Sequence, residues 1–398
     1  MKKDFVLKIF EGFSIERWND LVRPFDLVEM DKAAEKMVLA YIIGKYEENR
    51  GADVDWEWMI YAGLFDLLKK IALCDIKSPV QRLIHAEYPE EYKKLNEWVV
   101  SQYKDMISND GIFAKFTDYV GRTAGCVNRV TARIFRAAHK YSTLRELEMI
   151  SMVNEPERLE KIRKEVNADL YSFLDLRGLQ LLITKQKPFD LLMRIEQLRF
   201  QTRWNQTPRV PKTSVLGHCF FVAVLTLLFM HETGVKMCRK RVYNNFFSAL
   251  FHDLPEAVTR DIISPVKQAT HGLPSIVKNI EDAIVSKDLI PYMEDFYKDE
   301  ILYFTSDEFS NRILLDGKTL ETSFEELNEK YNSDEYNPVD GKLVRLADHF
   351  SALLEADASI RYGITSTHLV EGRANLMKTY PSGKIVNGID ACELFSSI

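Results

Sequence analysis

Apolar residues recur at spacings of three and four along most of the chain, which is the period of an amphipathic helix. In the first half this pattern covers residues 36–46, 56–71, 92–107, 127–150 and 156–183. In the second half it covers residues 189–203, 217–233, 241–251, 276–302 and 342–360. No convincing run of alternating strand positions interrupts these segments. The pattern therefore predicts an all-α fold.

Part of the first half recurs in the second half at a constant offset. Arg17-Trp18-Asn19 reappears as Arg203-Trp204-Asn205, which is 186 positions later. At the same offset, residues 62–85 align without a gap to residues 248–271, and nine of the 24 positions are identical. Residues 133–146 resemble 342–355, where the offset has grown to 209. We therefore expect a tandem duplication of helical bundles, with domains at 1–185 and 186–398.

Composition limits the class of protein and its partners. A chain of 398 residues is long for one domain and sufficient for two. The net charge of −6 offers no general attraction to a nucleic acid polymer or an anionic membrane. Five scattered cysteines fit a reducing compartment, the N-terminus is a poor signal peptide, and the longest apolar run is too short to span a bilayer. We expect a cytoplasmic protein.

Four ionisable residues lie on three apolar helical segments of the second half. His218 begins one segment, His252-Asp253 ends another, and Asp348 lies inside a third. Ionisable side chains rarely enter a core unless they are paired or bind a metal. Mixed nitrogen and oxygen ligands suit a divalent transition metal such as Mn, Fe, Co, Ni or Zn better than Ca.

This H…HD…D pattern resembles that of the HD-domain phosphohydrolase superfamily. The stretch HDLPEAVTRDIISPVK at 252–267 is similar to one found in bacterial HD-domain 5′-deoxynucleotidases. That family also has an Arg-Trp pair upstream of its first metal histidine, as Arg203-Trp204 is here. The resemblance runs from about residue 189 to 356, and the first half carries a degraded version.

The resemblance implies a role for each matching residue. One divalent transition metal ion per chain would be bound by His218, His252, Asp253 and Asp348. Glu256 would handle the attacking water or its proton, in a site where Asp253 also serves catalysis. Substrate contacts would come from Arg203 and Lys267 to phosphate, Trp204 to the nucleoside and Asp261 to a sugar hydroxyl. The family commonly has Ser-Glu before the first histidine, whereas this chain has Leu216-Gly217, which predicts that a supporting contact is lost or replaced.

The substrate contacts have simpler alternative interpretations. Trp204 could be a core residue, and Arg203 could belong to a surface ion pair. Lys267 could be solvated, and Asp261 could cap a turn. The histidines at 231, 271, 349 and 368 lack comparable neighbours, and we expect them to be structural.

The first half lacks the metal ligands. Asp66-Leu67 replaces the His-Asp pair, and His139 stands where Asp348 stands in the second half. The counterpart of His218 is Lys32 at the constant offset, or Glu35 in a shifted alignment. We therefore expect no catalytic metal in this half. Because the deoxynucleotidases that the chain resembles are homodimers, the resemblance implies a pseudo-dimer in which this half is a structural partner. A regulatory nucleotide pocket around Arg17-Trp18 and Asp75 is the alternative.

The combined interpretation is a metal-dependent phosphohydrolase. The preferred substrate is a 5′-(deoxy)nucleoside monophosphate, which would give a nucleoside and orthophosphate. A nucleoside triphosphate triphosphohydrolase or a phosphodiesterase is an alternative on the same fold. A non-catalytic nucleotide sensor or scaffold is the alternative of another class, and retention of the five chemical residues in the second half argues against it.

Overall fold

A computed structural model describes residues 2–74, 76–121, 128–260, 270 and 272–398. The structure is 68% helical with only short strands, which confirms the all-α prediction. The first half contains the helices α1 (Lys3–Phe10), η1 (Glu11–Phe13), α2 (Glu29–Asn49), α3 (Trp56–Leu73), α4 (Ser78–Glu87), α5 (Pro89–Tyr103), α6 (Asp110–Gly121), α7 (Arg129–Ile150), α8 (Pro156–Tyr171) and α9 (Arg177–Ile183).

The second half contains more helices and all of the described strands. The helices are α10 (Lys187–Ile195), α11 (Gln197–Phe200), α12 (Val215–Glu232), α13 (Arg239–Phe251), α14 (Glu256–Thr259), α16 (Leu273–Asp288), η2 (Ile290–Tyr292), α17 (Asp295–Thr305), α18 (Phe324–Glu329), η3 (Asp334–Tyr336), α19 (Gly341–Arg361), α20 (Thr367–Thr379) and α21 (Ala391–Ser396). The strands are β1 (Asn311–Leu315), β2 (Lys318–Glu321), β3 (Val339–Asp340), β4 (Ile385–Val386) and β5 (Ile389–Asp390), in sheets of order β2-β1-β3 and β4-β5.

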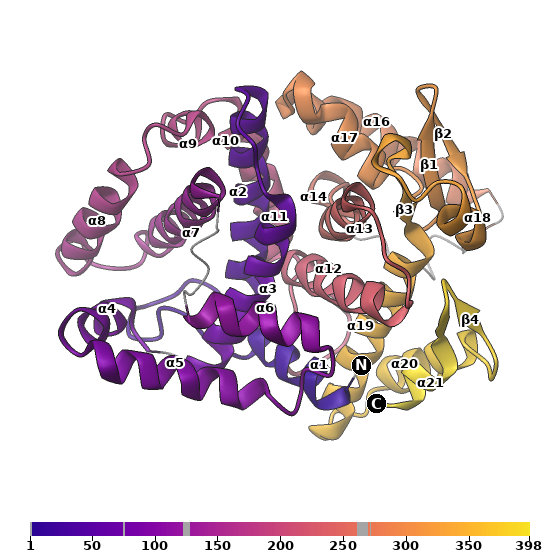
Figure 1. Ribbon diagram of the computed structural model, residues 1–398, viewed down its shortest axis with the longest axis horizontal. Helices are drawn as coiled ribbons and strands as arrows, with labels where there is room; N and C mark the ends of the chain where they lie inside the picture. Colours follow the sequence, from indigo (N-terminus) through magenta and orange to yellow (C-terminus); the bar gives the residue numbers. More distant parts are fainter. Residues whose placement is uncertain (1, 75, 122–127, 261–269, 271) are drawn as a thin grey trace.

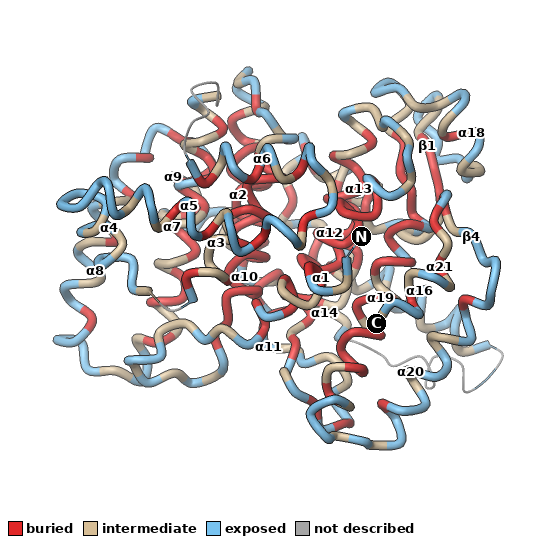
Figure 2. Tube along the Cα trace, turned by 60° about the horizontal axis from the view of Figure 1, so that its bottom comes forward, coloured by how far each residue is buried: buried red, intermediate tan, exposed pale blue. Residues whose placement is uncertain are grey.

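Two long helices, α2 and α12, pack against each other in the middle of the molecule (Figure 1). Around α2 lie α3, α7 and α9, and around α12 lie α13 and α19. Buried positions concentrate on these central helices, whereas α4, α5 and α8 are largely exposed (Figure 2). Within the described residues, α12 is the one helix long and apolar enough to cross a membrane, but 89% of its apolar window is buried inside this protein. A helix that is apolar on all sides is expected at such a core position.

The backbone around the two Arg-Trp pairs repeats at the offset of 186. Trp18 and Trp204 both adopt a left-handed conformation, with φ of 56° and 54°. An isolated antiparallel bridge precedes each central helix, between Glu16 and Val28 and between Thr202 and Ser214. The amide of Arg17 donates to the carbonyl of Leu27 at 2.7 Å, and the amide of Arg203 donates to that of Thr213 at 3.0 Å.

Several predicted helices have different bounds in the structure. The segment predicted at 276–302 is divided into α16, η2 and α17, because Pro291 lacks the N–H that a continuous helix needs there. The helix predicted at 36–46 begins at Glu29, since its first two turns bury charged residues that an apolar pattern does not detect. The strands were not predicted, although Asp316-Gly317 between β1 and β2 is a strong hairpin signal and both residues have positive φ.

Candidate metal centre

Three helices bring the four predicted ligands together. His218 lies in the first turn of α12, His252 is the C-cap of α13, and Asp348 lies within α19. Nε2 of His218 is 3.2 Å from Oδ1 of Asp348 and 3.8 Å from Oδ2 of Asp253. Nε2 of His252 is 3.3 Å from the same Asp253 oxygen. The donor atoms of His218, His252 and Asp348 all lie within 4.8 Å of one another, as a shared ion requires.

The hydrogen bonding of the two imidazoles fits a metal ion. Nε2 of His218 and Nε2 of His252 are both buried without a hydrogen-bond partner. The other nitrogen of each ring is held, since Nδ1 of His218 is 3.1 Å from Oγ of Ser351 and Nδ1 of His252 is 2.7 Å from the carbonyl oxygen of Ala249. Orientation of a ligand histidine through its second nitrogen is usual at metal sites. The residues present therefore fit a divalent ion.

The charge states of the ligands agree with this fit. Burial, together with the positive charge of Arg203, lowers the pKa of His218, which favours the neutral imidazole that a metal needs. Burial alone would raise the pKa of Asp348, but the neighbouring His218 and Arg203 outweigh it and hold that pKa well below its ordinary value. Cys219 also lies near His252 and Asp253. Burial raises the pKa of its thiol well above the ordinary value, which disfavours the thiolate form.

Arg203 places a cation beside the ligand cluster. Its Nη atoms lie 3.9 Å from Oδ2 of Asp253 and 3.9 Å from Oδ1 of Asp348, and its Nε lies 3.3 Å from Oε2 of Glu355. Burial opposes the charged form, but the surrounding carboxylates, Glu355 first, raise the pKa of the guanidinium above its ordinary value. Arg203 is therefore a charged group next to the ligands, and its contact with a substrate phosphate stays a prediction.

Trp204 is fixed by polar and steric contacts. Its indole Nε1 donates to Oε2 of Glu355 at 2.8 Å. The far edge of the ring lies against Gly372, where an added Cβ would come within 2.7 Å of Cη2 of Trp204. The indole is partly exposed. These contacts are consistent with a structural role and leave the predicted nucleoside contact as a prediction.

Glu355 is a central residue of the site that the sequence analysis did not select. It is 1% exposed and accepts hydrogen bonds from Trp204, Arg203 and the hydroxyl of Thr213. Burial raises its pKa, but Arg203 and Arg209 outweigh this and lower the pKa to about 2. A signal was present, because Glu146 occupies the matching position of the first half and bonds Arg17 and Trp18 in the same way.

Three further residues of the predicted site and one unpredicted residue complete the account. Glu256 begins α14, its amide donates to the carbonyl of Asp253 at 3.0 Å, and its charge helps to raise the pKa of Arg203. Asp261 and Lys267 lie outside the described residues. Glu308 was not predicted, yet its carboxyl interacts electrostatically with His252 and Asp253, and burial raises its pKa.

The equivalent region of the first half contains lysines instead of ligands. Because α2 and α12 begin 186 residues apart, Lys32 is the counterpart of His218, and the shifted match to Glu35 is not needed. Nζ of Lys32 donates to Oγ1 of Thr143 at 2.8 Å, and burial lowers its pKa to about 7. Nζ of Lys36 is 2.5 Å from Oδ2 of Asp66. Among the described residues of this half, no group of metal-binding side chains is found.

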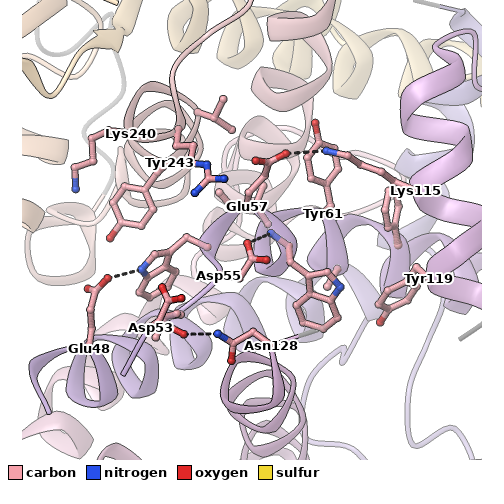
Figure 3. Close-up of a pocket in the computed structure, with 18 of the residues that line it drawn as sticks. Glu48, Asp53, Asp55, Glu57, Tyr61, Lys115, Tyr119, Asn128, Lys240 and Tyr243 are labelled. Carbon is pink, nitrogen blue, oxygen red and sulfur yellow. Dashed lines mark hydrogen bonds and ion pairs between the residues drawn. The ribbon is translucent and has the colours of Figure 1, made fainter. Parts of the chain in front are cut away.

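A separate cavity of about 670 Å³ lies between α3, α6 and α13, away from the ligand cluster (Figure 3). Its polar residues are mostly paired with one another. Glu57 pairs with Lys115 at 2.7 Å, and Glu48 accepts from the indole of Trp56 at 2.7 Å. These contacts stabilise the charged residues that line the cavity, and they point to no particular class of ligand.

Comparison with known proteins agrees with the geometry. A family model described as the HD domain matches residues 195–377, the segment that contains all four predicted ligands. No curated protein matches the chain. HD domains in general bind divalent metals and act as phosphohydrolases. The match supports a relation of the segment from 195 to 377 to the HD-domain superfamily.

Proposed function

We propose that this protein is a metal-dependent 5′-nucleotidase, which hydrolyses (deoxy)nucleoside 5′-monophosphates to a nucleoside and orthophosphate. The observation that carries the proposal is the position of Arg203, a partly buried cation 3.9 Å from two ligand carboxylates. A cation that close to the ligand cluster is suited to bind a substrate phosphate. The planar guanidinium can donate two parallel hydrogen bonds to phosphate oxygens and also offsets their negative charge. The resemblance of 252–267 to the bacterial 5′-deoxynucleotidases narrows the substrate class.

Each residue of the site has a separate role in the proposed hydrolysis. A bound divalent ion lowers the pKa of water and polarises a phosphoryl oxygen. Arg203 offsets the negative charge that builds on the phosphoryl oxygens as the water oxygen bonds to phosphorus and the bond to the 5′ oxygen breaks. Glu256, one turn beyond His252-Asp253, accepts the proton of the attacking water, and the leaving 5′ oxygen takes up a proton from water to become the nucleoside hydroxyl. Glu355, which accepts from both Arg203 and Trp204, keeps Arg203 in place, and we propose that the exposed part of the indole contacts the nucleoside.

The proposal is tested by phosphate release from a panel of 5′-nucleotides with Mn, Co, Ni, Zn or Mg added. We expect metal-dependent release of orthophosphate from monophosphates, and its loss in Asp253→Ala. The matched control is Asp66→Asn in the first half, which keeps an acceptor for the buried Lys36 ammonium group. We expect it to retain the activity because, among the described residues, no ligand cluster surrounds that residue.

Other products would select another function on the same fold. Release of triphosphate from nucleoside triphosphates identifies a triphosphohydrolase, and a new monophosphate from a diester identifies a phosphodiesterase. Metal binding and nucleotide binding without any hydrolysis identify a sensor or scaffold. Each of these results would contradict the nucleotidase.

We also propose that the chain arose by tandem duplication and folds as a pseudo-dimer. The support is the repeated set of backbone contacts at the offset of 186 and the packing of α2 on α12, which are equivalent helices. Isologous contact between equivalent elements is typical of twofold association.

In this arrangement the first half is a structural partner. Arg17 and Trp18 are both bonded to Glu146, and Arg17 also pairs with Glu29 at 2.5 Å, so their polar groups already have protein partners. We expect equilibrium dialysis of the full chain with a nucleotide to give one nucleotide site. No metal is added, so that the nucleotide is not hydrolysed. Two sites would favour the regulatory pocket.

A further inference from the structure

The helices α2 and α12 cross at residues that occupy equivalent positions. Asp31 is the third residue of α2 and Gly217 is the third residue of α12, and the two are 186 positions apart. An added Cβ at Gly217 would lie 2.5 Å from Oδ1 of Asp31, so a side chain at 217 and the present position of Asp31 exclude each other. Asp31 is 3% exposed. The carboxylate of Asp31 and the ring of Phe13, both from the first half, therefore occupy the space that a side chain at 217 would need.

This carboxylate is bonded to the N-cap of α12. Oγ of Ser214 accepts from the amide of Gly217 at 2.8 Å and donates to Oδ1 of Asp31 at 2.5 Å. In an ordinary capping box the acidic partner is the third residue of the same helix. Here that residue is glycine, and the carboxylate at the cap comes from the other half of the chain. A hydroxyl that donates to a carboxylate is also a better acceptor, because linked hydrogen bonds polarise one another.

The capped turn carries the first metal ligand. His218 directly follows Gly217, and its amide donates to the carbonyl of Ser214 at 3.1 Å. Its ring is completely buried, with Nδ1 near Ser351 and Nε2 directed at Asp348. A shift of this turn would therefore move Nε2 relative to the other ligands.

We propose that Asp31 is a positioning residue for His218, acting through Ser214, so that the half without ligands completes the metal centre of the half that has them. The inference rests on the proposed metal role of His218. It also accounts for the Leu216-Gly217 departure, because the contact missing from α12 is replaced by Asp31.

The test compares cobalt binding by the full chain and by Asp31→Ala, with Co²⁺ affinity measured by titration calorimetry and coordination by the visible absorption of bound Co²⁺. We expect about tenfold weaker binding and an altered absorption spectrum in the variant, as for the loss of a group that supports a metal ligand. The matched control is Tyr61→Phe, which removes a 2.7 Å contact from the first half to His231 at the other end of α12. We expect this control to leave both readouts unchanged.

A double variant tests whether Asp31 acts through Ser214. Ser214→Ala removes the hydroxyl that bonds both Gly217 and Asp31, so we expect about tenfold weaker cobalt binding. Adding Asp31→Ala should cause no further loss, because both substitutions break the same link. A further loss in the double variant would show that Asp31 does not act through Ser214. If Asp31→Ala does not fold, Asp31→Asn keeps the shape and a weaker acceptor, and we expect it to bind with intermediate affinity.

The outcomes separate this inference from the proposed function. Cobalt binding by Asp31→Ala or Asp31→Asn equal to that of the unmodified chain would overturn the positioning role. An equal loss in Tyr61→Phe would also overturn it, by showing a general effect of the contact between the halves. An unmodified chain that binds no cobalt would instead contradict the proposed metal centre.

Discussion

The ammonium group of Lys36 lies 2.5 Å from a carboxylate oxygen of Asp66, the residue that stands where His252 stands in the second half. Burial would raise the pKa of Asp66, but Lys36 outweighs this and holds the pKa well below its ordinary value. The side chain of Lys36 is 2% exposed, so its charge is balanced inside the protein. The ammonium group of Lys36, rather than a metal ion, thus balances the charge of Asp66.

Metal content should therefore be one divalent ion per chain. The first half already pairs its carboxylate with a lysine, and a bound ion would have to displace a buried ammonium group. Elemental analysis of the protein purified under native conditions measures the ratio, with His218→Ala as the variant expected to bind none. Two ions per chain would contradict the prediction.

Glu355→Gln should reduce catalysis while metal binding persists. The substitution removes the charge that holds Arg203 and the strongest acceptor for Trp204, so we expect kcat/KM to fall about 10- to 100-fold. Steady-state kinetics and metal analysis on one sample separate the two effects. The matched control is Glu146→Gln, which breaks the equivalent contacts in the first half. It should lower stability and leave kcat/KM unchanged, and an equal loss of kcat/KM in both variants would refute a local role for Glu355.

The ionisation of Glu300 should make the free energy of unfolding depend on pH. It bonds Tyr41 and Lys45 of the first half and Tyr243 and Lys240 of the second. Burial raises its pKa, but the two lysines outweigh this and lower the pKa from 4.5 to about 2. A lowered pKa stabilises the folded state above the unfolded value, and this contribution is lost as the pH falls from about 4.5 towards 2.

The size of this effect follows from the shift, at about 1.4 kcal/mol per pKa unit. We expect Glu300→Gln to lower the free energy of unfolding by at most about 3.5 kcal/mol at pH 7, with the difference shrinking towards pH 2. Urea denaturation at several pH values measures it. Glu57→Gln, in an exposed pair with Lys115, should change stability by less than about 1 kcal/mol. A pH-independent difference for Glu300→Gln would contradict the linkage.

The buried ion pair of Arg241 and Asp340 should stabilise the first turn of α13. Both side chains are fully buried, and Nε of Arg241 is 2.7 Å from Oδ2 of Asp340. Arg241→Met leaves an uncompensated buried carboxylate, so we expect a loss of about 3–5 kcal/mol in urea denaturation. Adding Asp340→Asn removes that charge and should recover part of the loss. A double variant less stable than the single one would show that Asp340 is stabilised mainly by its other partners.

The sequence predicted those parts of the site that depend on residue type and helical position. His218, His252, Asp253 and Asp348 stand out because ionisable residues interrupt apolar helices, and the structure brings all four together. Glu355 and Asp31 do not stand out, since a carboxylate in a helix is usually a solvated residue. Their burial depends on partners from distant segments, Arg203 and Ser214, which helical periodicity does not reveal. For the same reason the apolar pattern predicts this helix only from residue 36, although α2 begins at Glu29.

The contact between α2 and α12 also determines how the protein behaves on dilution. Two halves joined in one chain meet at an effective concentration set by the connecting segment, which does not change with the amount of protein in solution. A homodimer of separate subunits dissociates when it is scarce, and each subunit must then carry both the ligands and the contact surface. In a single chain each half always has its partner, so selection can retain the ligands in one half and the supporting surface in the other.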